Sequence, residues 1–471
     1  MKSNKLNRII AAGLLGIMTL SLCACGKTEQ VVKIEPMKKE EVYTLGFDFL
    51  GGKDVLPIGG YYGPAAQIDG GDARLAPDHY TDEFYSLIQE SGVNLLVYPN
   101  GDWMGARDYV IKSLELCEKY NIGIYLYDSR ICMPSETNPP SVEDVDSYLT
   151  EYCDYPAFCG VYVKDEPSTE YYHPVAGGYM SRYAPVYNAL SELDVVGSVN
   201  FYGILDTSDL GAEQYDKYVK ELCDTCAPSY LCFDYYVWDG RASKYGYFRN
   251  ISIIQKYATE NKIPWWCFIQ AGGQWNDAKA KFDSADLYPN VGQFRWNVNT
   301  ALACGAKGIS YFPCIQPWAF AYALTEEFDF QRNGLIGAAG NKTQWFYYAQ
   351  QTNEQIRAVD SVLMNATNKG VIVTGKEAKE DTKDLASVIN GTSWRELADV
   401  KGTALIGCFN YQGKTALYVT NYERTYAQKI TLNLHDKYDV DVTVNGKVSN
   451  LTTNKLVLDL KAGEGALVVF E

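Results

Sequence analysis

The sequence predicts a (β/α)8 TIM barrel followed by a small C-terminal antiparallel β-sandwich domain. Between residues 56 and 363, eight short apolar runs alternate with longer amphipathic segments. From Gly370 onward the pattern changes to alternating apolar and polar residues separated by glycine turns. At 471 residues the chain is also longer than most single domains, which favours two folding units. We therefore expect a barrel over 42–366 and a β-domain over 367–471.

The eight apolar runs have the character of parallel strands. Each is short and continuously apolar, as expected where a strand is buried on both faces. They are Leu56–Tyr62, Val93–Pro99, Ile122–Asp128, Phe158–Lys164, Val195–Tyr202, Tyr230–Tyr236, Pro264–Ile269 and Gly308–Phe312. Eight strand–helix units of this length are typical of the barrel, although a doubly wound open sheet is a competing architecture.

The segments between these runs have helical periodicity, and several begin with a capping residue such as Ser141 in Ser-Val-Glu-Asp. The predicted helices are 80–91, 108–120, 142–152, 181–193, 213–223, 251–260, 291–304 and 344–363. In the second domain, turn signals such as Val444-Asn-Gly-Lys separate the strand-like runs. The strands predicted there are 416–421, 429–434, 440–444, 455–460 and 466–471.

The N-terminus has the features of an exported lipoprotein. A basic start is followed by an apolar run from Ile9 to Leu22, too short to span a bilayer but typical of a signal peptide. The run ends in Leu22-Cys-Ala-Cys-Gly, which resembles the bacterial lipoprotein box with Cys25 as the lipid-accepting residue. We expect a leader over 1–25, a polar tether over 26–41, and anchoring to the outer face of the bacterial cell membrane. An ordinary signal peptide is the alternative.

Composition argues against several function classes. The formal net charge of -16, with no basic cluster, disfavours a nucleic-acid partner. Three histidines are too few and too scattered for a histidine-based metal site. The Cys223–Cys226 pair lacks the second pair that a zinc site needs, and most other cysteines lie in apolar runs. We expect no metal and no cofactor.

Polar and aromatic residues gather at the ends of the predicted strands, where such a barrel builds its active site. Aromatic rings stack on the CH groups of sugars, amides and acids read hydroxyls, and paired carboxylates cleave glycosidic bonds. The sequence therefore predicts a carbohydrate site with Asp165, Glu166 and Asp234 as catalytic candidates. The candidate substrate-binding residues are Tyr62, Asp128, Arg130, Asn200, Tyr202, Tyr236, Trp238, Gln270, Tyr311 and Trp318.

The sharpest motif is Gly160-Val-Tyr-Val-Lys-Asp-Glu-Pro167 at the end of the fourth run. It resembles clan A of the glycoside hydrolases, the β-galactosidase-type barrels, whose fourth strand ends in Asn-Glu-Pro. The resemblance implies that Glu166 is the general acid/base, with Asp165 in place of the asparagine. It covers about 45–365, and a trailing β-domain is usual in that group.

The seventh run departs from that pattern. Clan A enzymes carry a nucleophilic glutamate there, whereas this chain has Gln270, and an amide cannot serve as a conventional nucleophile. One explanation is a pair of Asp165 as nucleophile and Asp234 as acid, which would resemble the α-galactosidase type. Another is an inverting reaction in which Glu166 is the acid and Asp128 or Asp234 activates water. A shifted seventh strand is the third.

Neighbouring side chains on a strand point to opposite faces, so only one of Asp165 and Glu166 should reach the barrel mouth unless the chain has already turned at Pro167. The leading hypothesis is a cell-surface glycoside hydrolase acting on oligo- or polysaccharide. The alternative is a surface glycan-binding lipoprotein without catalysis, for which Gln270 is the main argument. A structural scaffold of the cell envelope is a third hypothesis.

Overall fold

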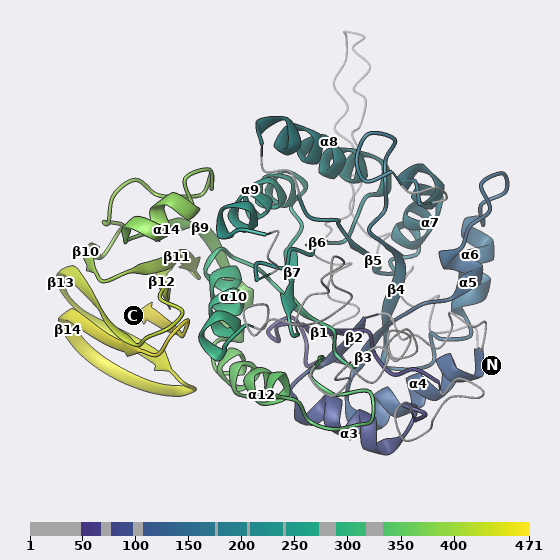
Figure 1. Cartoon of the computed structure of the whole chain (residues 1–471), viewed down its shortest axis with the longest axis horizontal. Helices are drawn as coiled ribbons and strands as arrows, with labels where there is room; N and C mark the ends of the chain where they lie inside the picture. Colours follow the sequence, from purple (N-terminus) through teal and green to yellow (C-terminus); the bar gives the residue numbers. More distant parts are fainter. Residues whose placement is uncertain are drawn as a thin grey trace, which may run out of the picture. The chain divides into compact units, whose positions relative to one another are not determined.

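The computed structural model describes residues 49–66, 77–97, 107–174, 178–204, 208–238, 242–272, 289–316 and 333–471, all within one compact unit that spans Lys38–Glu471. Its central feature is a parallel eight-stranded sheet surrounded by helices (Figure 1). Within these ranges, no helix combines the length and apolar character needed to cross a membrane.

The eight parallel strands lie where the sequence predicts them. They are β1 Ile58–Tyr61, β2 Leu95–Val97, β3 Gly123–Leu126, β4 Phe158–Asp165, β5 Gly197–Asn200, β6 Leu231–Phe233, β7 Trp265–Gln270 and β8 Ile309–Phe312. Their order is β5-β4-β3-β2-β1-β8-β7-β6. The sheet closes because Phe201 pairs with Phe233 and its amide donates to the Cys232 carbonyl at 2.7 Å. This closure makes the sheet a barrel and excludes the open doubly wound alternative.

Helices cover the outside of the barrel in the order that the sequence predicts (Figure 1). They are α3 Asp82–Glu90, α4 Arg107–Tyr120, α5 Ser129–Cys132, α6 Val142–Leu149, α7 Met180–Glu192, α8 Asp209–Cys226, α9 Lys244–Asn261, α10 Val291–Ala303, α12 Gln344–Arg357 and α13 Asp360–Asn365. The single helix predicted over 344–363 is wrong, because it breaks between α12 and α13. Asp360 accepts hydrogen bonds there from the Leu56 amide at 3.3 Å and from Arg357 at 2.7 Å.

Aromatic side chains fill the barrel interior. Tyr125 of β3, Tyr230 just before β6 and Trp266 of β7 stack on one another, with Tyr230 and Trp266 at 4.2 Å between ring centroids. Tyr61, Tyr162 and Phe268 belong to the same buried cluster. This interior is a packed core, so a ligand has access only at the mouth.

The C-terminal region forms a seven-stranded antiparallel sheet, which fits the predicted sandwich. Its elements are β9 Ala366–Val373, α14 Lys376–Asp381, β10 Leu397–Lys401, β11 Ala404–Tyr411, β12 Lys414–Asn421, β13 Gln428–Val444, β14 Lys447–Leu460 and β15 Gly465–Phe470. β13 is continuous where the sequence predicts two strands. Asn299 of α10 joins this sheet to the barrel, because it accepts from the Tyr418 hydroxyl at 2.7 Å and donates to the Gly463 carbonyl at 2.8 Å.

Candidate active site

Asp165 ends β4 and faces the barrel mouth because of a register shift. Tyr162 pairs with Ser198 and Asp165 pairs with Asn200, so β4 carries one more residue than β5 between these pairs. Such a bulge re-aims the side chains that follow it. Asp165 consequently lies on the same face as Tyr162, whose hydroxyl donates to Asp165 Oδ1 at 2.8 Å.

Glu166 reaches the same mouth because the chain has already turned at this residue. Its φ of 45° lies in the left-handed region, which is uncommon for a residue with a side chain and often marks a functional site. The Glu166 amide donates to the Asn200 carbonyl at 2.9 Å and so fixes the turn to β5. The charges of Asp234 and Asp165 both act on its side chain. Both neighbouring carboxyl groups therefore belong to one site.

Three side chains donate hydrogen bonds to Asp165. Tyr61 donates to Oδ2 at 2.8 Å, while Tyr162 at 2.8 Å and the Asn200 amide at 3.3 Å donate to Oδ1. These three partners are all donors, which matches a carboxylate that accepts hydrogen bonds on both oxygens.

Asp234 follows β6 and points inward, in phase with Tyr230 and Cys232 of the interior cluster. Asn200 Nδ2 donates to Asp234 Oδ1 at 3.2 Å as well as to Asp165. Because both distances start from one nitrogen atom, the two acceptor oxygens are less than about 6.5 Å apart. Asn200, which is 2% exposed, thus fixes the spacing of the two carboxylates.

Burial and neighbouring negative charges raise the pKa values of both Glu166 and Asp234. Burial, followed by the charges of Asp234 and Asp165, raises the pKa of Glu166 well above its usual range. Burial and the charge of Asp165 also raise the pKa of Asp234, whereas hydrogen bonds from Asn200 and Glu166 lower it. Glu166 is therefore the member of the pair that keeps its proton more firmly. A carboxyl group kept protonated near neutral pH is what a general acid requires.

Aromatic rings border this cluster. Tyr62 lies 5.6 Å and Tyr236 lies 5.1 Å from Phe312, measured between ring centroids. Tyr202 stacks on His173 at 3.8 Å with an interplanar angle of 7°, and His173 Nε2 lies 4.0 Å from Glu166 Oε2. These contacts bring Tyr62, Tyr202 and Tyr236, all candidates from the sequence, to the carboxylate cluster.

Gln270 is the last residue of β7, so the seventh strand has the predicted register and a shifted strand does not account for the missing glutamate. The side chain is 2% exposed. Its Oε1 accepts from the Trp238 amide at 3.2 Å, and its Nε2 donates to the Gly272 carbonyl at 3.0 Å. Gln270 thus links the segments after β6 and β7, and this role requires both a donor and an acceptor.

Replacing Gln270 by glutamate should therefore destabilise the protein rather than create a nucleophile. An ionised carboxylate cannot donate to the Gly272 carbonyl and would be buried beside it. We expect Gln270→Glu to lose about 2 kcal/mol of unfolding free energy, measured by urea denaturation. Gln270→Met, which removes both polar ends without adding charge, is the control. A Gln270→Glu variant as stable as the natural chain would contradict this role.

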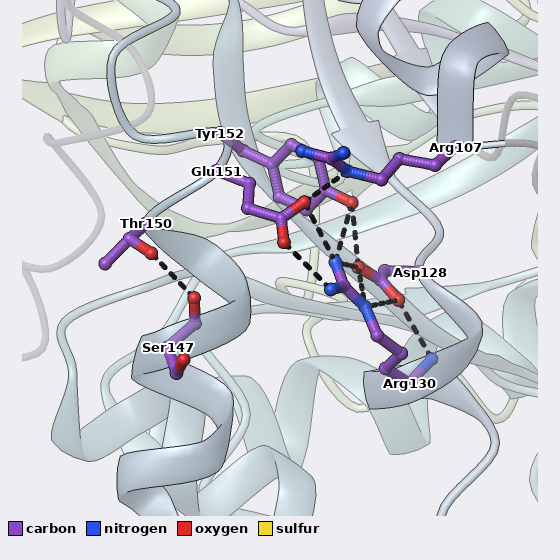
Figure 2. A network of polar contacts seen from close by, with 7 residues as sticks. All are labelled: Arg107, Asp128, Arg130, Ser147, Thr150, Glu151 and Tyr152. Carbon is purple, nitrogen blue, oxygen red and sulfur yellow. Dashed lines mark hydrogen bonds and ion pairs between the residues drawn. The ribbon is translucent and has the colours of Figure 1, made fainter.

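Asp128 and Arg130 form a separate network beside β3 (Figure 2). Arg130 donates to both Asp128 oxygens, at 2.6 Å for the closest pair, and to Glu151 Oε1 at 2.9 Å. Tyr152 donates to Asp128 at 2.8 Å, and Arg107 pairs with Glu151. Within the described part of the chain, none of these contacts reaches the catalytic candidates. The expectation that Asp128 and Arg130 bind substrate, or that Asp128 activates water, finds no support in this geometry.

Tyr311 lies apart from the carboxylate cluster. Tyr311 is fully buried and faces the helices, because its hydroxyl donates to Asn353 at 2.6 Å and its ring stacks on Phe294 at 5.6 Å. Successive side chains on a strand point to opposite faces, and in β8 it is Phe312 that faces the barrel interior. Tyr311 therefore points away from the interior, which explains why the prediction for this residue failed. Trp318 and Cys25 lie outside the described residues. Trp238 is half-buried, with its ring 5.5 Å from Trp296.

No group of histidine, cysteine or acidic residues suited to a metal ion occurs within the described ranges. No disulfide links the cysteines of the described ranges, and Cys223 and Cys226 are both buried. Sequence reasoning missed Tyr61 and Tyr162 as partners of Asp165. Tyr61 was adjacent to a candidate, and the bulge that brings Tyr162 to Asp165 has no signature in the sequence.

No protein-family model and no curated protein matches this chain. Among solved structures, it is similar to a β-galactosidase from Bacillus circulans sp. alkalophilus at 9% identity, with 88% of this chain and 99% of that chain covered and a TM-score of 0.55. A Bacteroides fragilis NCTC 9343 protein provisionally named an α-galactosidase matches at 9% identity and a TM-score of 0.45, with 89% and 79% covered. Amylases and a provisionally named fucosidase are also among the similar structures. The similarity to the β-galactosidase shows that the two chains share a barrel fold.

Proposed function

We propose that the protein is a glycoside hydrolase that acts on oligo- or polysaccharide with retention of configuration. The observation that carries this proposal is that Asp165, held by three hydrogen-bond donors, shares the barrel mouth with Glu166, which the left-handed turn brings there and whose raised pKa suits a general acid. A retaining mechanism needs one carboxylate as nucleophile and one carboxyl group as acid/base. The barrel fold shared with glycoside hydrolases agrees with this proposal.

Asp165 is the nucleophile and Glu166 the general acid/base in this mechanism. Asp165 attacks the anomeric carbon as the glycosidic bond breaks, and the leaving oxygen takes the proton of Glu166. Glu166 then removes a proton from water, whose oxygen attacks the same carbon and releases Asp165. Asp234 holds the proton on Glu166 between turnovers, because its negative charge opposes a second negative charge beside it.

The test is hydrolysis of 4-nitrophenyl glycosides by residues 26–471. The panel contains galactosides, glucosides and fucosides in both anomeric forms, alongside Glu166→Gln and the exposed control Asp154→Asn. We expect turnover by the natural chain and the control, and a loss of about 10²–10⁴-fold in Glu166→Gln. No turnover on these or on natural oligosaccharides, combined with glycan binding that survives Glu166→Gln, would instead favour the non-catalytic glycan-binding protein.

We also propose that the protein is exported and anchored through a lipid on Cys25. The basic start, the apolar run and the cysteine motif support this proposal. Full-length protein grown with radiolabelled palmitate should carry the label and sediment with membranes, and Cys25→Ala should abolish both. An unlabelled natural chain that is nevertheless secreted would favour the ordinary signal peptide.

A further inference from the structure

The two oxygens of Asp165 have different surroundings. Oδ1 accepts two hydrogen bonds, from Tyr162 at 2.8 Å and Asn200 at 3.3 Å, whereas Oδ2 accepts one, from Tyr61 at 2.8 Å. Each carboxylate oxygen has two lone pairs directed outward in the carboxylate plane. Both lone pairs of Oδ1 are therefore occupied, whereas one lone pair of Oδ2 accepts no hydrogen bond from the described part of the chain.

Both phenols are permanent donors. Tyr61 is 3% and Tyr162 is 2% exposed, and each lies in the interior cluster beneath the mouth. Burial first, and then the charge of Asp165, raises the pKa of both phenols well above its usual value. They keep their protons near neutral pH, so the asymmetry between the two oxygens persists in the resting protein.

We infer that Oδ2 of Asp165 is the attacking atom, and that Tyr61 and Tyr162 are positioning residues for different steps of the reaction. This inference rests on the proposed function. In the first step, the open lone pair of Oδ2 forms the bond to the anomeric carbon, and the electron pair of the broken glycosidic bond leaves with the departing oxygen, which takes the proton of Glu166. Tyr61 fixes the rotation of the carboxylate that aims this lone pair.

Tyr162 has its main effect in the second step. After attack, Oδ1 is the carbonyl oxygen of an ester and retains its hydrogen bonds from Tyr162 and Asn200. When water attacks, the electron pair of the ester bond returns to Asp165, and negative charge develops again on both oxygens. A donor already in place at Oδ1 stabilises that charge, as in other preorganised anion sites.

The two phenylalanine variants should consequently differ in their kinetics on an activated aryl glycoside that the natural chain hydrolyses. For Tyr61→Phe we expect kcat/KM to fall about 10–100-fold, because the attacking oxygen is no longer aimed. For Tyr162→Phe we expect kcat to fall about 10-fold with a parallel fall in KM, so that kcat/KM changes little. A burst of nitrophenol, showing accumulated glycosyl-enzyme, should accompany Tyr162→Phe but not Tyr61→Phe.

Tyr230→Phe is the matched control, since it removes a buried phenol of the same interior cluster that is bonded to Ser198 and makes no hydrogen bond to Asp165. It should leave the kinetics unchanged, and thermal melting of all three variants checks that they fold. Equal losses of kcat/KM in Tyr61→Phe and Tyr162→Phe, or a burst in Tyr61→Phe alone, would overturn the assignment of Oδ2 as the attacking atom. A natural chain without any turnover would instead count against the proposed function itself.

Discussion

Asp165→Gly should lower kcat for glycoside hydrolysis by about 10⁴-fold or more, because it removes the atom that forms the covalent intermediate. The substitution also leaves space beneath the anomeric carbon. Azide can enter this space and attack a substrate with a good leaving group, such as a 2,4-dinitrophenyl glycoside. We expect partial rescue by azide and a glycosyl azide of inverted configuration, identified by NMR.

Glu166→Ala gives the complementary result. Its first step should proceed on the same activated substrate, which needs no acid, and azide should then attack the glycosyl-enzyme to give a product of retained configuration. Asp154→Asn, an exposed carboxyl-to-amide change near β4, should behave like the natural chain. An inverted azide product from Glu166→Ala would reverse the two roles.

Asp234→Asn should stabilise the protein while impairing catalysis. Three carboxyl groups share one buried site, and neutralising one removes repulsion that the folded state otherwise carries. We expect a gain of about 1–2 kcal/mol in unfolding free energy at pH 8. Hydrolysis should fall about 10²-fold or more, because the proton on Glu166 is then held less firmly.

The stability of the natural chain should depend on pH for the same reason. The raised pKa values of Glu166 and Asp234 mean that the folded state keeps protons which the unfolded chain releases above about pH 4. The folded state then binds more protons, so its stability falls as pH rises from about 4 through neutrality.

Urea denaturation at pH 5 and pH 8 tests both statements. The gain from Asp234→Asn should be larger at pH 8 than at pH 5, and Asp154→Asn should show no such difference. A variant that is destabilised equally at both pH values would argue that Asp234 serves packing and not charge.

Local sequence patterns were sufficient to predict the positions of the barrel strands. Each of the eight apolar runs overlaps a strand, from Leu56–Tyr62 around β1 to Gly308–Phe312 around β8. A parallel strand of the barrel is buried on both faces, so it consists of consecutive apolar residues that can be recognised in the sequence. The break between α12 and α13 was missed because it depends on Leu56, about 300 positions away along the chain, which binds Asp360.

For the site, we selected polar and aromatic residues that follow the predicted strands. This selection identified four residues that lie together: Asp165, Glu166, Asn200 and Asp234. The same selection also included Asp128, Arg130 and Tyr311, whose hydrogen bonds are made outside this carboxylate cluster. Position after a strand predicts the end of the barrel at which a residue lies. It does not predict whether a neighbouring acid or helix residue has already taken its hydrogen bonds.

The sequence by itself determined that this chain forms a barrel with carboxylates at its mouth, because burial on two faces and the position of strand ends are local properties. Tertiary structure decided the chemistry of those carboxylates. The bulge in β4, the left-handed turn at Glu166 and the shared amide of Asn200 set which acids face one another. Tertiary contacts also make Gln270 a link between the segments that follow β6 and β7. Hydrogen-bond partners and charge spacing come from strands far apart in sequence, and only their closure into a barrel brings them within reach.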